Sequence, residues 1–204
     1  MPSGDLEALV AAFRRLAPVP DAALRELAQV THPRTFARGA WLLHGGQRAT
    51  HCFFIALGLV RELYIGDDGV EQTRSFVAEG AVTGSLLDLQ SGEPSITWIQ
   101  ALEETRTVAF RYADLEAACE RFPELHVVLR RAAEALYRQK TRREHEMLAL
   151  DARARYARWS VENAGLDARV SRRLLASYLG VTPEHLSRLH RSGARTPRRT
   201  GRTR

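Results

Sequence analysis

The sequence is poor in cysteine and has no long apolar segment. Its two cysteines, Cys52 and Cys119, form no C-x-x-C pair, so neither a disulfide framework nor a cysteine-ligated zinc or iron–sulfur site is expected. The best apolar run, Cys52 to Val60, is far too short to cross a bilayer. The N-terminal segment MPSGDLEALV carries acids and no basic region, which argues against a secretory signal. We therefore expect a cytoplasmic protein with no membrane partner.

Net charge is also scarce outside the C-terminal segment. The formal net charge is +6, but five arginines lie in the last ten residues, and without them the charge is +1. Charge alone is therefore weak evidence for a nucleic-acid partner. Segment 192–204 is rich in arginine and almost free of apolar side chains, so it is predicted to be a disordered tail.

Hydrophobic periodicity indicates an α+β fold. Helical spacing covers about the first 30 residues, and short apolar runs then alternate with glycine turns from Phe36 to Phe110, including Asp67-Asp68-Gly69. Many short strands at close spacing are typical of a sandwich or small barrel.

A long helix is predicted over residues 122–150. Its apolar residues follow alternating steps of four and three, and the next positions of that seam, Gln139 and Arg143, are polar. Either a solvated surface helix or a dimer helix fits this pattern. We favour the dimer, because so long a helix needs a partner for its apolar stripe. The predicted dimer residues are Leu125, Leu129, Ala132 and Leu136.

Residues 151–191 are predicted to form a helix-turn-helix. Ser171 can cap a helix over 172–179, Gly180 supplies a left-handed turn residue, and Thr182 can cap a second helix with Pro183 at its first position. An ordinary helical hairpin also contains glycine and proline. Here the caps, the glycine and the apolar positions all agree with a helix-turn-helix, whose second helix enters the DNA major groove.

Polar side chains on that second helix suit DNA. Glu184 can accept from cytosine N4 and Arg188 can fork onto guanine, although on a plain surface helix the two would only form an i, i+4 pair. The predicted base-contacting residues are Glu184, His185, Ser187 and Arg188, and the predicted phosphate-contacting residues are Ser171, Arg172, Thr182 and Arg191.

This order of elements resembles the CRP/FNR family of transcriptional regulators over about residues 20–191. Glu184, Ser187 and Arg188 match its E-x-x-S-R signature, and ALEETRTVAF resembles the last strands of its β-roll. The resemblance implies an antiparallel β-roll (double-stranded β-helix) sensor at 1–121, a dimerisation helix at 122–150 and a winged helix-turn-helix at 151–191. It further implies a homodimer that reads TTGA-like inverted repeats in double-stranded DNA through helix 183–190, with RNA polymerase as a candidate partner.

The sequence departs from this family at the phosphate cradle. A cyclic-nucleotide site needs a Glu soon after its glycine and an Arg that clamps the phosphate. Here Ser85 follows Gly84, and Glu93-Pro94-Ser95 stands where the Arg is expected. Cyclic AMP is therefore not expected as effector. The N-terminal cysteines of oxygen-sensing members of the family are absent, so an iron–sulfur cluster is not expected either. No cofactor or metal is predicted, and the effector is unknown. The residues predicted to line an effector pocket are Arg61, Arg74, Gly84, Ser85 and Gln100.

The wing of the family also lacks a counterpart, since no alternating apolar residues follow Arg191. A second hypothesis is therefore a ligand-binding and dimerisation module whose DNA binding is impaired. A third, a cupin-like enzyme, needs an H-x-H pair and a downstream Glu. His44 and His51 do not have that spacing, and no catalytic residue is predicted.

Overall fold

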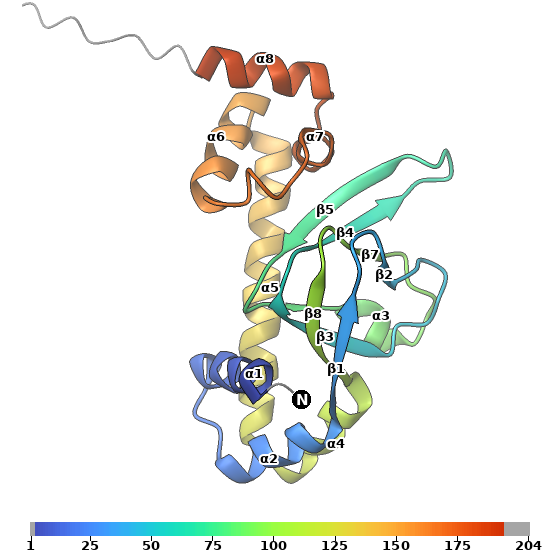
Figure 1. Ribbon diagram of the computed structural model, residues 1–204, viewed down its shortest axis with the longest axis vertical. Helices are drawn as coiled ribbons and strands as arrows, with labels where there is room; N and C mark the ends of the chain where they lie inside the picture. The colour runs from blue at the N-terminus through green and yellow to red at the C-terminus, as the bar shows by residue number, and fades with distance from the viewer. Residues whose placement is uncertain (1–2, 194–204) are drawn as a thin grey trace, which may run out of the picture. The chain divides into compact units, whose positions relative to one another are not determined.

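The computed structural model describes residues 3–193 and divides into two compact units, residues 1–142 and 143–204 (Figure 1). The division falls inside the helix that the sequence predicts over 122–150. Residues 194–204, most of the predicted tail, lie outside the described residues. No described helix has the length and apolarity that a membrane span requires.

The first unit begins with two amphipathic helices, α1 (Ser3–Leu16) and α2 (Asp21–Val30). Pro18 and Pro20 lie in the link between them. The apolar positions of the helical spacing, such as Leu9 and Phe13, are buried.

Two antiparallel four-stranded sheets follow and confirm the predicted α+β roll. One sheet has the order β1-β8-β3-β6 and the other β2-β7-β4-β5. The edge strand β1 contains Pro33, and the Asp67-Asp68-Gly69 turn joins β4 to β5, as predicted. The strands are β1 (Thr31–Phe36), β2 (Trp41–Leu43), β3 (His51–Leu57), β4 (Val60–Ile65), β5 (Glu71–Val77), β6 (Val82–Thr83), β7 (Trp98–Ala101) and β8 (Thr105–Arg111), with the short helix α3 (Leu86–Ser91) between β6 and β7.

Gly58 makes the turn between β3 and β4 in a conformation that other residues rarely adopt. Its φ is +106°, and a Cβ there would lie 2.7 Å from the Glu104 carbonyl oxygen. Its N–H donates to Glu79 at 2.8 Å. The sheet therefore requires a glycine at this turn.

The main core of this unit joins the sheet β1-β8-β3-β6 to helices. Phe54, Val108 and Phe110 pack there with residues of α1, α2, α4 (Tyr112–Arg121) and the start of α5 (Glu124–Ala149). Burial of these side chains is the main stabilising contribution to the unit.

The start of α5 differs from the predicted dimer seam. Leu125 is 0% exposed within its own chain and belongs to the core, and Leu129 packs against that core. Ala132 is exposed and Leu136 half-buried. The alternating spacing of this first part therefore reflects burial inside one chain, and a partner could reach only the later positions.

The second unit comprises the last turns of α5 and three short helices, α6 (Ala152–Glu162), α7 (Arg172–Leu179) and α8 (Pro183–Gly193). The Asp151 side chain caps α6 by accepting from the Ala154 N–H at 2.8 Å. Because α8 continues to Gly193, the predicted tail does not begin at residue 192.

Candidate functional site

Both helices of the helix-turn-helix in the second unit begin where the sequence predicts and α7 ends where it predicts, but α8 runs to Gly193, beyond the predicted end at residue 190. The Ser171 hydroxyl accepts from the Leu174 N–H at 3.4 Å, and that of Thr182 accepts from the His185 N–H at 3.2 Å. Gly180 ends α7 in the left-handed conformation, with φ 66°. Leu175, Leu179 and Leu186 are buried in the second unit, which sets the packing of α7 and α8.

The C-terminal end of α7 is fully hydrogen-bonded, although the last four carbonyls of a helix have no partner within it. The N–H groups of Gly180 and Val181 bind the carbonyls of Ala176 and Ser177. Two arginines from other helices donate hydrogen bonds to the two remaining carbonyls, those of Tyr178 and Leu179.

Arg143 of α5 donates to the Tyr178 carbonyl, and Arg155 of α6 donates to that of Leu179 at 3.0 Å. We call this pair the arginine clamp. Sequence reasoning missed both roles and treated Arg143 only as a polar interruption of a seam. The one signal was the charge of Arg143 at a seam position.

The predicted base-contacting residues of α8 differ in how freely they face solvent. Glu184 is exposed, but hydrogen bonds from its own backbone and from the Thr182 hydroxyl lower the pKa of its carboxyl. The Ser187 hydroxyl donates to the Pro183 carbonyl at 2.9 Å, and His185 is half-buried.

Arg188 is exposed, and within residues 3–193 it makes no hydrogen bond or ion pair. The four predicted phosphate-contacting residues, Ser171, Arg172, Thr182 and Arg191, are exposed as well. Arg188 is therefore the member of the base-contacting set that is ready to bind a base edge without first giving up a contact.

The residues predicted to line an effector pocket separate into two groups. Arg61 and Gln100 bind each other, with the Arg61 Nε 2.9 Å from the Gln100 Oε1, and Arg61 also pairs with Glu71 at 2.6 Å. Arg74 lies 3.6 Å from Glu62. Successive residues of a strand face opposite sides, so Arg61 and Glu62 of β4 place the two groups on opposite faces of the sheet.

Buried carboxylates that the sequence reasoning missed dominate the second group. Glu62 accepts from the hydroxyls of Thr83 at 2.8 Å and Ser75 at 2.6 Å, and it is 7% exposed. Asp88, 4% exposed, accepts from Ser95 at 2.5 Å.

Near these carboxylates, Ser85 lies 3.4 Å from Thr97, and Gly84 has a φ of +150°. The sequence "VRELYI" carried no signal for an inward-facing Glu62, because residues 60–63 are all buried and burial does not alternate along β4. Arg74 brings a positive charge beside Glu62 at this place.

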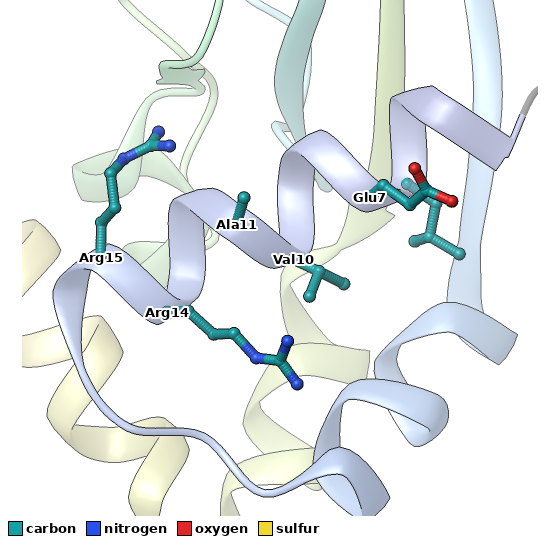
Figure 2. A pocket seen from close by; sticks show the side chains of 6 residues that line it. Glu7, Val10, Ala11, Arg14 and Arg15 are labelled. Carbon is teal, nitrogen blue, oxygen red and sulfur yellow. The ribbon is translucent and has the colours of Figure 1, made fainter.

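A hollow along α1 contains none of these residues (Figure 2). Apolar side chains such as Val10 lie beside Arg14 and Arg15 there, and the figure shows them on one helix.

Comparison with known proteins finds a similar domain for the β-roll. Residues 33–122 match the cyclic nucleotide-binding domain. No curated protein matches the sequence.

Solved structures extend the likeness to both units. FixK2 from Bradyrhizobium japonicum is 22% identical, with 80% of this chain and 86% of that chain covered and a TM-score of 0.69. The c-di-GMP responsive global regulator CLP from Xanthomonas campestris is 17% identical, with 86% and 92% covered and a TM-score of 0.70. The catabolite activator protein of Thermus thermophilus is 23% identical, with 90% and 86% covered and a TM-score of 0.55. Residues 33–122 are therefore similar to the cyclic nucleotide-binding domain, and the chain has the same fold as these solved structures.

Proposed function

We propose that this protein is a transcription regulator that reads double-stranded DNA through α8. The observation that carries the proposal is the exposed Arg188 on the second helix of a fully capped helix-turn-helix. Two of the three similar structures are named as a global regulator and an activator protein, which supports a regulator rather than an enzyme.

In this proposal Arg188 donates two hydrogen bonds to the O6 and N7 of guanine. Glu184 accepts from cytosine N4 once its carboxylate leaves the Thr182 hydroxyl. Ser171, Arg172, Thr182 and Arg191 hold phosphates and so fix the register of α8 in the groove.

We further propose that two copies bind a TTGA-like inverted repeat, one half-site each. Apolar side chains on α5 support an association of copies, since Tyr137 is 71% and Leu148 81% exposed. RNA polymerase remains a candidate partner of such a dimer.

The effector is proposed to be neither cyclic AMP nor an iron–sulfur cluster. The buried carboxylates Glu62 and Asp88 disfavour a phosphodiester in the roll. Burial raises the pKa of the Cys52 thiol to about 12, and burial likewise raises the pKa of Cys119. Neither thiol therefore readily forms the thiolate that a metal ligand needs.

Fluorescence anisotropy with a TTGA…TCAA duplex and a scrambled duplex, at about 0.15 M salt, tests the proposal. The unmodified protein should prefer the repeat by about a hundredfold, or about 2.7 kcal/mol. Arg188→Ala should cost about 1–3 kcal/mol on the repeat and relax the preference at one base pair.

Arg138→Ala is the matched control, because Arg138 is an exposed arginine on α5 and should leave both affinities unchanged. Equal affinity of the unmodified protein for both duplexes would instead favour a ligand-binding module that no longer reads sequence.

A further inference from the structure

We infer that Arg143 and Arg155 are positioning residues for DNA reading, a role that rests on the proposed function. Neither side chain needs to touch DNA in this role. The arginine clamp fixes the end of α7, and α7 ends at Leu179 only a short turn before α8 begins at Pro183. The position of the end of α7 therefore determines the position of the start of α8, the helix proposed to read DNA.

Arg155 joins the ends of two helices. Its Nε donates to the Leu179 carbonyl at 3.0 Å, and its Nη1 donates to the Leu150 carbonyl just beyond α5 at 2.6 Å. A planar guanidinium can donate in two fixed directions at once, which a lysine ammonium on its flexible stem does less rigidly. A cation is also favourable at a helix C-terminus, where the helix dipole is negative.

Arg143 makes the second half of the clamp. Its guanidinium carbon lies 4.0 Å from the centre of the Tyr178 ring while its Nη2 donates to the Tyr178 carbonyl. Arg143 is half-buried, and burial is the largest cause that lowers its pKa. Nearby, the buried Glu146 pairs with Arg158 at 3.1 Å and supplies a negative charge.

The far end of α8 is held from the same helix as Arg155. The next residue of α6, Tyr156, places its hydroxyl 2.8 Å from the Nδ1 of His190. α6 thus contacts the chain just before α8 and again near its end. Functional side chains need a support that holds them to roughly 0.5 Å, and this two-point attachment provides one for Arg188.

The test compares Arg143→Gln and Arg155→Gln on the repeat and scrambled duplexes at several salt concentrations. Both variants should lose about tenfold or more on the repeat, since a hydrogen bond from a charged group is lost. They should keep about the same affinity for the scrambled duplex and the same salt dependence, because no phosphate contact is lost.

Two further variants serve as references. Arg153→Gln changes an exposed arginine on the same helix and should have no effect. Arg172→Gln, at a predicted phosphate contact, should weaken binding to both duplexes and reduce the salt slope by about 1. An equal loss on both duplexes with a reduced slope would make Arg143 or Arg155 a phosphate contact and overturn the inference, as would unchanged affinity for the repeat.

Amide hydrogen exchange in the free protein separates this inference from the proposed function. The clamp variants should speed exchange at Val181, His185 and Leu186, whose N–H groups bond within the turn and the first turn of α8, and leave β-roll amides unchanged. If the clamp variants show faster exchange but the unmodified protein shows no preference between the duplexes, the proposed function is wrong and the role of the clamp in positioning α8 is retained.

Unchanged exchange at these amides in both clamp variants would contradict the inference that Arg143 and Arg155 position α8. Tyr178→Leu, which removes the ring under Arg143 and keeps every carbonyl, gives the same test should a glutamine variant fail to fold.

Discussion

At the scale of single residues, His51 shows how the roll changes the acidity of a side chain. The ring is half-buried on β3, lies 2.8 Å from the Thr50 hydroxyl through its Nδ1 and stacks on Phe53. Burial is the largest cause that lowers its pKa, followed by the charges of Arg34 and Arg111.

We therefore predict that His51 makes folding sensitive to mild acid. The unfolded chain, in which this histidine titrates near 6.5, binds the proton at a higher pH than the folded chain does. Stability should fall as the pH drops below about 7, and His51→Gln should reduce that fall. Urea unfolding at several pH values, with an NMR titration of the ring, measures both. A ring that titrates at or above 6.5 in the folded protein would contradict the prediction.

At the scale of elements, the turn between β3 and β4 depends on the missing side chain of Gly58. In Gly58→Ala the new Cβ would meet backbone of the segment 104–105, which cannot turn away as a side chain could. Strain and overlap together should lower the free energy of unfolding by about 3 kcal/mol. Gly69→Ala is the control, because Gly69 also has a positive φ but has open space around it, so strain alone should cost about 1 kcal/mol. If chemical denaturation shows that the two variants lose the same free energy of unfolding, overlap of the new Cβ with backbone at Gly58 does not contribute.

Elements also show what the sequence could predict. The starts of α7 and α8 and the end of α7 were predictable because Ser171, Thr182 and Gly180 act on residues within one turn. The clamp was not, since Arg143 binds a carbonyl 35 positions away and spacing does not reveal such a partner. Leu125 was assigned to a dimer because periodicity reports that a face is buried and not which chain buries it.

The effector pocket was harder still. Arg61 and Arg74 were grouped because strands of the roll were expected to bring them together, but the facing of β4 and β5 depends on register. A register shift between Glu62 and Leu63 lies between the two strands. Irregularities of this kind are set by packing across the sheet and leave no local sequence signal.

At the scale of the whole molecule, positive charge is concentrated in the last ten residues, where five arginines account for most of the net charge of +6. A variant that lacks residues 195–204 should bind every duplex more weakly, and the slope of log affinity against log salt should shrink by at most about 4.5. The ratio between repeat and scrambled duplexes should stay the same, because phosphate contacts carry no sequence information. A collapse of that ratio in the same anisotropy titrations would assign sequence reading to the segment itself.

The edge strand of the roll has a consequence for the association of newly folded copies. β1 leaves one side of its backbone unpaired, and an open strand edge can recruit the same edge of another molecule. Pro33 offers no N–H for such a pairing, the exposed Arg34 beside it brings positive charge to the edge, and the exposed His32 is a polar neighbour. We expect these three residues to disfavour edge-to-edge aggregation of folded copies. Replacing them with apolar, strand-favouring residues should let the β1 edges of two copies pair and so promote fibril formation.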